Sequence, residues 1–276
     1  MSIPGVQLLA GKTAAITGGT TGIGRAIALV YLSHGAKVCV NHLGDQPLTH
    51  SGTGAPASAS HYATLKEEAA KEGWGDNLCE SVGDISRPET GEALVQEVVS
   101  RWGRLDVFVS NAGICRFAEF LTLEHELLTA TVNTNLIGAF TAVQAAARQM
   151  VAQSPQGGSI IGVSSISALV GGGGQTHYTP TKAGILSLMQ SCAVALGKYN
   201  IRCNALLPGT IRTYLNDHDM EDTEKRKYME SRTALGRLGV PNDLAGPAVF
   251  LGCEQLSGYV TGSQMLVDGG LFVNLQ

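Results

Sequence analysis

Three side chains close together in the sequence have the types and the spacing of an acid–base site. Ser165 lies just before a run of glycines, and Tyr178 and Lys182 follow that run, four residues apart. Residues four apart share one face of a helix, so we expect the phenol and the ammonium to lie together. A tyrosine has a pKa near 10 in solution, and a nearby positive charge favours its phenolate form. Tyr178 would then exchange a proton with a substrate oxygen that Ser165 holds by a hydrogen bond.

Proton exchange of this kind suits a reaction in which a cofactor takes hydride from the carbon that bears the oxygen. An isolated tyrosine–lysine pair at this spacing is more often a surface tyrosine beside a solvated lysine. The catalytic interpretation of Ser165, Tyr178 and Lys182 therefore depends on whether the rest of the chain provides a cofactor site.

A glycine-rich turn near the N-terminus favours such a site. The sequence TGGTTGIG, residues 17–24, follows a short β-rich run and opens a helical one. Glycines there allow a tight turn and a close approach of the backbone to a pyrophosphate at the helix N-terminus. An ordinary turn between strand and helix has the same composition, so the motif is suggestive by itself. The expected contacts are Gly18, Thr20, Thr21, Gly22, Ile23 and Gly24, and Lys182 and Tyr178 would also reach the cofactor.

Later strand ends add further candidates for dinucleotide binding. Asp84 and Ile85 follow the third expected strand, where the carboxylate would accept a hydrogen bond from the adenine amino group, although Asp84 is equally suited to cap a helix. The next strand ends in small residues that would let a cofactor pass, unless they simply form a turn. The expected contacts at the last two strand ends are Asn111, Ala112, Gly113, Pro208, Gly209, Thr210 and Ile211.

The elements that must position these residues alternate along the chain. Helical spacing is expected at 22–35, 62–73 and 178–196, and short apolar β-rich runs are expected as strands at 12–17, 36–41, 78–84, 104–113, 159–165, 201–209 and 264–270. This alternation predicts an α/β fold, a single Rossmann-like doubly wound domain with a seven-stranded parallel sheet and helices on both faces. Ligands bind such sheets at the carboxyl ends of the strands.

No linker or internal repeat divides the chain, so we predict one dinucleotide-binding domain over residues 1–276, with its core at about 10–272. Residues 43–61 are rich in Gly, Pro, Ser and Thr and are expected to form an inserted surface loop.

Composition narrows the class of protein. The 276 residues are 44% hydrophobic, with a formal charge of −4 and a pI of about 6.0, so no basic patch favours nucleic acid. Neither a secretory signal nor a run long enough for a membrane span is visible, which predicts a soluble, cytoplasmic protein without a membrane partner. The six cysteines form no CxxC pair and predict no metal site, and Cys39, Cys192 and Cys203 are expected to be buried free thiols.

Taken together, these motifs resemble the classical short-chain dehydrogenases/reductases over about residues 10–272. The resemblance implies a fourth catalytic residue, Asn135 in VNTNLIGAF, which would hold a water that links Lys182 to solvent. Asn135 is also compatible with a buried asparagine that binds backbone, and both interpretations can hold. The family is usually tetrameric, so a homotetramer is expected, with the C-terminal VDGGLFVNLQ near a neighbouring subunit.

Within that family, three segments are most similar to members that oxidise the anomeric C1 hydroxyl of L-rhamnose to the lactone in rhamnose catabolism. The segments are SSISALVGGGGQTHYTPTKAGILSLMQS, VNHLGD and LVDGGLFVNLQ. The resemblance implies a sugar substrate, with related aldoses such as L-lyxose and L-mannose also accepted. Another sugar 1-dehydrogenase, or a reductase of ketones or 3-oxoacyl thioesters, is the alternative. A dinucleotide sensor without activity is less compatible with an intact Ser165, Tyr178 and Lys182.

A sugar needs several hydrogen-bonding partners, and Ser167 and Gln175 flank the proposed site together with Ser165 and Tyr178. Gln175 is equally suited to stabilise its own loop. Cys115 and Arg116 follow Gly113 and are candidates for the opposite wall, but Arg116 is equally compatible with an exposed position and is not counted among the predicted site residues.

Cofactor choice depends on the end of the second strand, where an acidic residue usually selects NAD and an arginine selects NADP. That strand ends here in Asn41 and His42, which are neutral, and the glycine turn carries no basic residue before Arg25. We therefore expect NAD as cofactor, with NADP also accepted.

Overall fold

A single sheet runs through the molecule. The computed structural model describes residues 7–44, 61–213 and 221–274. Its strands are all parallel and lie in the order β3-β2-β1-β4-β5-β6-β7. They are β1 (Thr13–Thr17), β2 (Lys37–His42), β3 (Leu78–Val82), β4 (Val107–Ser110), β5 (Gly158–Val163), β6 (Ile201–Pro208) and β7 (Gln264–Val267). The predicted seven-stranded parallel sheet is confirmed.

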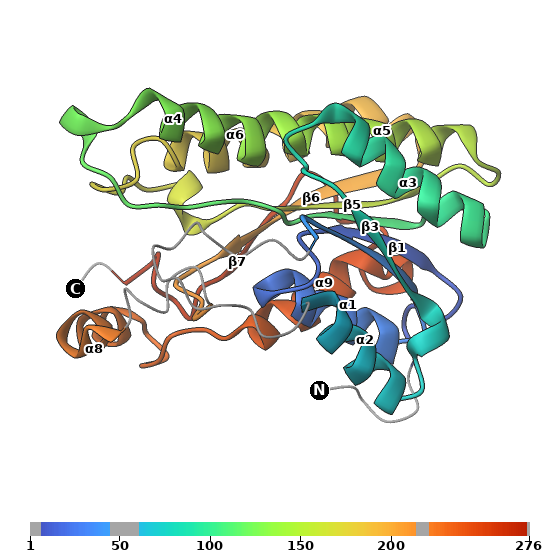
Figure 1. Cartoon of the computed structure of the whole chain (residues 1–276), viewed down its shortest axis with the longest axis horizontal. Helices are drawn as coiled ribbons and strands as arrows, with labels where there is room; N and C mark the ends of the chain where they lie inside the picture. Colours follow the sequence, from blue (N-terminus) through green and yellow to red (C-terminus); the bar gives the residue numbers. More distant parts are fainter. Residues whose placement is uncertain (1–6, 45–60, 214–220, 275–276) are drawn as a thin grey trace.

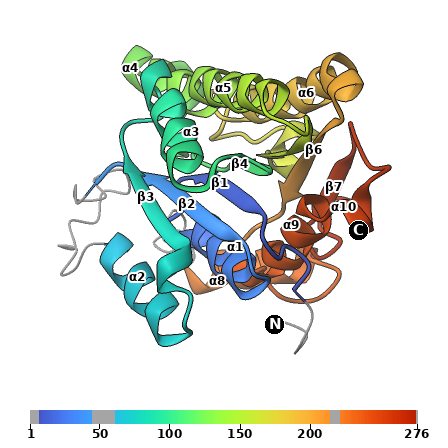
Figure 2. The ribbon, with the colours of Figure 1, turned by 90° about the vertical axis from the view of Figure 1, so that its right-hand side faces the viewer.

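Helices cover both faces of this sheet, as Figures 1 and 2 show. One layer holds α3 (Pro88–Trp102), α5 (Ala139–Ala152) and α6 (Thr179–Leu196), with α4 (His125–Val132) beside them, and the other holds α1 (Gly22–Ser33), α2 (His61–Lys71) and α9 (Ala245–Gly252). The remaining helices are α8 (Thr223–Arg232) and α10 (Glu254–Ser257), the 3-10 turns η2 (Gly75–Asn77), η3 (Phe120–Thr122), η5 (Ile166–Ala168), η6 (Gly197–Tyr199) and η7 (Pro241–Leu244), and the π-helix η4 (Asn133–Gly138).

The strands are apolar on both faces because each face is covered by helices. In β2, Val38 and Val40 pack into the core that α1, α2 and α9 close, whereas Cys39 between them packs into the core on the other side. This alternation places successive side chains in different cores. Because both faces of the sheet are covered, polar site residues lie at the ends of the strands.

Four strands end two or three residues before the predicted end, at Val82, Ser110, Val163 and Val267. β4 also begins later than predicted, where a buried carboxylate binds neighbouring segments. Residues 104–106 precede β4, and the buried Asp106 carboxylate accepts hydrogen bonds from the Thr13 amide at 3.0 Å and from Arg104 Nε at 2.9 Å. β5 ends at Val163, so Ser165 lies just beyond the strand. Of the predicted loop at 43–61, residues 45–60 lie outside the described residues, and His61 already belongs to α2.

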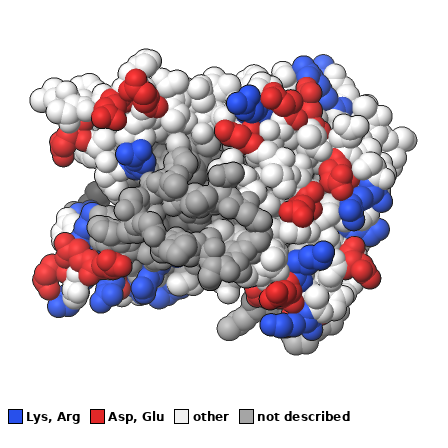
Figure 3. All heavy atoms as spheres, in the orientation of Figure 1, with Lys and Arg blue, Asp and Glu red and all other residues white. Residues whose placement is uncertain are grey.

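One cysteine differs from its predicted environment. Cys39 and Cys203 are buried free thiols, but Cys192 on α6 is only half-buried, although it packs against the same core as Cys203. In the described ranges we find no helix with the length and apolar content needed to cross a bilayer. Figure 3 shows acidic and basic side chains interspersed on the face drawn there.

Candidate active site

Nearly all predicted site residues line one cavity, of about 850 Å³, at the carboxyl ends of the strands. Gly24 and Asn135 are the two that do not. The members that line it are Gly18, Thr20, Thr21, Gly22, Ile23, Asn41, His42, Asp84, Ile85, Asn111, Ala112, Gly113, Ser165, Ser167, Gln175, Tyr178, Lys182, Pro208, Gly209, Thr210 and Ile211. Segments from residue 18 to residue 211 therefore meet in one place, as a doubly wound sheet requires.

The acid–base candidates lie together at the centre of this cavity. Tyr178 immediately precedes α6, and Lys182 lies in its first turn, with the Lys182 Nζ atom 5.5 Å from the centre of the Tyr178 ring. Lys182 Nζ donates a hydrogen bond of 3.0 Å to the carbonyl of Val163 at the end of β5. The Ser165 hydroxyl accepts a hydrogen bond from the Ser167 amide at 3.0 Å and also hydrogen-bonds Tyr178.

Burial dominates the electrostatics of this pair. It raises the pKa of Tyr178 well above its ordinary value, and the hydrogen bond to Ser165 opposes that rise only in part. Burial also lowers the pKa of Lys182 to about 8, because the charged ammonium loses its water. The sequence led us to expect that Lys182 would lower the pKa of Tyr178. In the chain alone, desolvation outweighs any such effect.

Asn135 lies beside the cavity and binds the backbone around Ile114. Its Oδ1 accepts from the Ile114 amide at 2.8 Å, and its Nδ2 donates to the Ile114 carbonyl at 2.9 Å. The residue lies in the π-helix η4, a widened turn that the apolar spacing of the sequence does not reveal. A Cβ on Gly113 would come within 3.2 Å of Asn135 Oδ1 and 3.5 Å of Lys182 Nζ, so the three residues are neighbours. The backbone-binding interpretation is thus observed, and the water relay stays a prediction.

The glycine turn has the shape that a dinucleotide phosphate needs. Gly18 and Gly22 have φ angles of +61° and +52°, which favour glycine. A Cβ at Gly24 would overlap the Gly18 carbonyl, so Gly24 serves close packing and does not line the cavity. Thr21, the residue that precedes α1, makes no side-chain cap bond, and among the described residues no side chain is found to cap this helix N-terminus. The first amides of α1 are therefore available to an anion, and these residues fit a bound dinucleotide.

The wall beside this turn is fixed by side-chain bonds to backbone. Thr17 Oγ1 accepts from the amides of Asn111 and Ala112, both at 2.9 Å, and Asn111 Nδ2 donates to the carbonyls of Thr17 and Gly18, both at 3.0 Å. These bonds join the ends of β1 and β4. Asn111 is thus committed to holding the turn and not to contacting a ligand with its side-chain nitrogen.

Next to the glycine turn, the side chains at the end of β2 are also engaged. Asn41 Nδ2 donates to the carbonyls of Ser81 and Gly83, and His42 Nδ1 accepts from the Gly44 amide at 3.1 Å. Asp84 Oδ1 accepts from the Ser86 amide at 2.9 Å, so the capping interpretation of Asp84 is observed, although the residue also lines the cavity.

The wall near Tyr178 includes residues that the sequence analysis missed. Gln175 Nε2 lies 3.3 Å from Cys115 Sγ, and both residues line the cavity, whereas Arg116 does not line it and is exposed. The missed lining residues include Phe117, Val170, Lys225, Met229 and Leu271. Lys225 Nζ lies 5.2 Å from the centre of the Phe117 ring. No local motif marks these residues, because only the fold brings their segments to the site.

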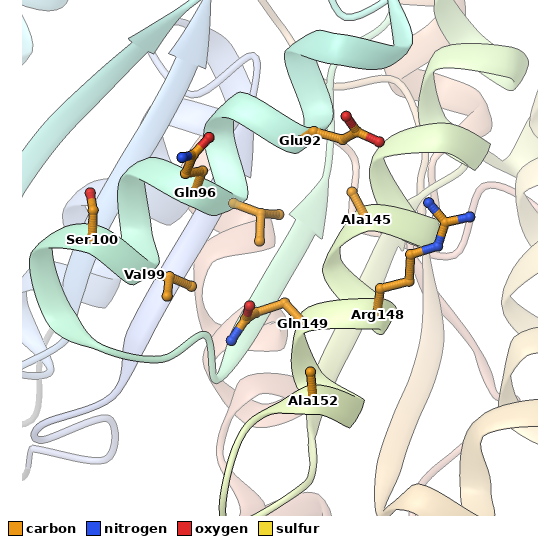
Figure 4. A pocket seen from close by; sticks show the side chains of 9 residues that line it. Glu92, Gln96, Val99, Ser100, Ala145, Arg148, Gln149 and Ala152 are labelled. Atoms are coloured by element: carbon orange, nitrogen blue, oxygen red, sulfur yellow. The ribbon is translucent and has the colours of Figure 1, made fainter.

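A second hollow, of about 480 Å³, lies between α3 and α5 (Figure 4). Glu92, Gln96 and Ser100 project from α3, and Arg148 and Gln149 project from α5. None of the predicted site residues lines it, so the cavity at the strand ends is the candidate active site. Within the described residues, no group of three His, Cys, Asp or Glu side chains is placed to hold a metal ion.

Comparison with known proteins places this geometry in a family. A family model described as enoyl-(acyl carrier protein) reductase matches residues 18–272. The chain belongs to the short-chain dehydrogenase/reductase family. Among family members, a Scheffersomyces stipitis protein named L-rhamnose-1-dehydrogenase is 60% identical, over 98% of this chain and 99% of that one. A Sphingomonas protein named L-rhamnose 1-dehydrogenase (NAD(P)(+)) is 51% identical over 98% of this chain and 100% of its own length.

A solved structure of the same family supports the fold. The gluconate 5-dehydrogenase of Burkholderia cenocepacia, crystallised with NADP and tartrate, has a TM-score of 0.85 and 30% identity. The match covers 97% of this chain and 98% of that structure. The short-chain dehydrogenase/reductase fold expected from the motifs is thereby confirmed.

Proposed function

We propose that this protein is an NAD(P)-dependent L-rhamnose 1-dehydrogenase, which oxidises the anomeric C1 hydroxyl of L-rhamnose to the lactone. The observation that carries the proposal is the single cavity in which Ser165, Tyr178 and Lys182 lie next to an uncapped helix N-terminus and its glycine turn. Full-length relatives named for this reaction, at 51% and 60% identity, support the choice of sugar.

The glycine turn and the strand ends would hold NAD or NADP, which supplies the hydride acceptor of the reaction when bound. The amides at the start of α1 would bind the pyrophosphate, and Asn111 would keep the turn in shape through its bonds to Thr17 and Gly18. Small residues after β4 and the Pro208–Gly209 end of β6 leave room along the cavity for the rest of the dinucleotide.

The chain's own residues would manage the proton of the sugar hydroxyl. Tyr178, as the phenolate, would accept it at its oxygen as the general base and become a neutral phenol, and Ser165 would hold the same sugar oxygen by a hydrogen bond. The buried phenol resists ionisation in the chain alone, so a positive charge beside it is needed to stabilise the phenolate. Lys182 supplies one such charge when it is protonated, and an oxidised nicotinamide would supply another. Asn135 would hold a water through which Lys182 exchanges its proton with solvent.

The sugar ring would contact the wall that Ser167, Gln175 and Cys115 form next to Tyr178. A set of donors and acceptors in a cavity favours a polyol, because a substrate without matching hydroxyls leaves those groups unpaired. L-Lyxose and L-mannose, aldoses of similar stereochemistry, are proposed as further substrates. The metabolic role proposed for the enzyme is L-rhamnose catabolism.

The proposal also covers the domain organisation, the localisation and the oligomeric state of the protein. The whole chain acts as one domain, with an insertion at residues 43–61 of the sequence. The protein acts in the cytoplasm, and it works as a homotetramer. Apolar side chains exposed on the outer layer of helices, such as Phe140 and Val194, support association.

The test is the initial rate of nicotinamide reduction, followed by absorbance, with L-rhamnose, L-lyxose, L-mannose, D-glucose and a simple secondary alcohol. Each is assayed with NAD and with NADP. Fast oxidation of L-rhamnose and its stereochemical relatives, with D-glucose poor, is the expected result. If every sugar is inert while ketones or 3-oxoacyl thioesters are reduced in the reverse assay, the sugar assignment is wrong and a reductase of the same family is the correct function.

A further inference from the structure

One side-chain atom in the candidate site lacks the partner that its environment demands. His61, the first residue of α2, lines the cavity, and its Nε2 atom is buried with no hydrogen-bond partner among the described residues. Buried polar atoms in proteins are nearly always hydrogen-bonded, so an unpaired ring nitrogen in a ligand cavity calls for an explanation.

The position of His61 indicates which part of a dinucleotide it can meet. Arg25 on α1 donates from Nη1 to the His61 carbonyl at 3.3 Å, and the next residue, Tyr62, stacks on His42 with ring centres 5.6 Å apart. The start of α2 is thus attached both to the helix of the glycine turn and to the end of β2. In doubly wound sheets, the end of the second strand is where the 2′ position of the adenosine ribose is read.

Other polar groups near this corner already have partners. His42 has both ring nitrogens engaged, with Nδ1 on the Gly44 amide and Nε2 2.8 Å from a Glu80 carboxylate oxygen. Arg25 forms an ion pair of 2.7 Å with Glu68, which faces it from α2. Asn41 binds backbone carbonyls with its Nδ2. His61 thus lines the cavity at this corner, and its buried Nε2 atom has no hydrogen-bond partner among the described residues.

We infer that His61 is a cofactor-specificity residue whose Nε2 hydrogen-bonds the 2′ substituent of the adenosine ribose. The inference rests on the proposed dinucleotide-dependent function. An imidazole bonds either a ribose hydroxyl or a phosphate oxygen, so one residue serves both NAD and NADP. Recognition of the 2′ position by His61 requires no acidic side chain, which would repel a 2′-phosphate. It also requires no unpaired arginine, which would select for that phosphate.

The experiment measures binding without turnover, by titration calorimetry of the full-length chain. The probes are NAD and NADP and two fragments that differ at the 2′ position, adenosine 5′-monophosphate and adenosine 2′,5′-bisphosphate. We expect His61→Leu to weaken the two 2′-phosphorylated probes about tenfold and the other two about threefold, since hydrogen bonds to charged groups are stronger than those between neutral ones. His61→Gln retains a side-chain donor and should restore much of the loss.

A matched control is His125→Leu, because His125 is an exposed histidine on α4 and does not line the cavity. Melting curves of all variants show whether the fold is kept, and His61→Gln gives the same comparison if His61→Leu does not fold. Unchanged affinities in both His61 variants, or equal losses for all four probes, would overturn the inference. Failure of the unmodified chain to bind any dinucleotide would instead overturn the proposed function, and this inference with it.

Discussion

At the scale of single residues, the site combines two ionisable groups whose pKa values are shifted by burial so that the charged form of each is disfavoured. Tyr178 resists losing its proton, and Lys182 resists keeping its own. Each is held by a specific neighbour, Tyr178 by Ser165 and Lys182 by the Val163 carbonyl. Such perturbed pairs are typical of catalytic sites, where the fold stabilises groups that would not adopt this state in water.

The proposed role of Tyr178 predicts that its hydroxyl is needed for turnover and not for cofactor binding. Tyr178→Phe should lower kcat by about 10²- to 10⁴-fold, the usual contribution of an acid–base group, while the Kd of the dinucleotide stays within a few-fold. Initial rates and calorimetry measure the two quantities. Tyr259→Phe is the control, since Tyr259 is fully exposed. Near-normal turnover in Tyr178→Phe would exclude the assignment.

Burial of Lys182 predicts a cost in stability that depends on pH. Its pKa is about 8 in the folded chain against 10.5 for an ordinary lysine, so the folded state binds fewer protons than the unfolded state between these values. The free energy of unfolding should therefore rise with pH from about 8 to 10.5, and Lys182→Met should lack this rise. Near pH 7 that variant should be more stable by on the order of 1–3 kcal/mol, yet inactive.

Urea denaturation of both proteins between pH 7 and 10.5 gives this comparison. The control is Lys198→Met, which removes an exposed lysine and should leave the pH dependence of the unmodified chain in place. Parallel curves for Lys182→Met and the unmodified chain would show that the ammonium is not desolvated.

At the scale of elements, the turn between β1 and α1 is the most constrained part of the site. It must fit Gly24 against the Gly18 carbonyl while Asn111 closes it from β4. Gly24 is thus needed because a larger residue would not fit against the Gly18 carbonyl. Gly18 and Gly22 are needed because their positive φ angles favour glycine.

Gly24→Ala should consequently lower the free energy of unfolding by about 1–3 kcal/mol and weaken dinucleotide binding, because the added methyl group forces the turn open. Thermal melts and calorimetry measure both effects. Gly246→Ala is the matched control: it lies in α9, its added Cβ would meet nothing within 4 Å, and it should be neutral or slightly stabilising. Equal behaviour of the two variants would contradict the packing argument.

The sequence predicted these elements well where local pattern decides them. The apolar runs of β1, β2 and β6 and the helical spacing of α1 and α6 are local features, and the structure has these elements within a residue or two of the predicted bounds. The π-helix around Asn135 was not predicted, since one widened turn leaves the apolar spacing intact. Met229 and Leu271 were not predicted as lining residues either, because they reach the cavity only through contacts between distant segments.

At the scale of the whole molecule, a single chain leaves large apolar side chains of its helical layer exposed to solvent. Val194 on α6 is 87% exposed and Phe140 on α5 is 49% exposed, both on the outer helical layer. Large apolar side chains exposed on helix faces are candidates for contact with another molecule.

The homotetramer proposed above should therefore depend on this layer. Light scattering after gel filtration should give four times the 28.8 kDa chain mass for the unmodified protein, and a smaller assembly for the double variant Phe140→Asp, Val194→Asp. Val82→Asp, at an exposed position on β3, is the control and should keep the mass unchanged. An unmodified chain that runs as a monomer would refute the proposal.

The strand order also bears on how the chain is made. The first four strands occupy one side of the sheet in the order β3-β2-β1-β4, and β5, β6 and β7 then follow outward from β4 in the order of the sequence. During synthesis, each late strand can add to the edge left by the one before it, without opening the sheet already formed. Until β5 leaves the ribosome, that edge is an unpaired β4. A nascent chain that stalls before β5 emerges would thus expose the unpaired edge of β4, and the open edge then moves to β5 and to β6 until β7 completes the sheet, so Tyr178 and Lys182 join the site while the edge of β5 is still unpaired.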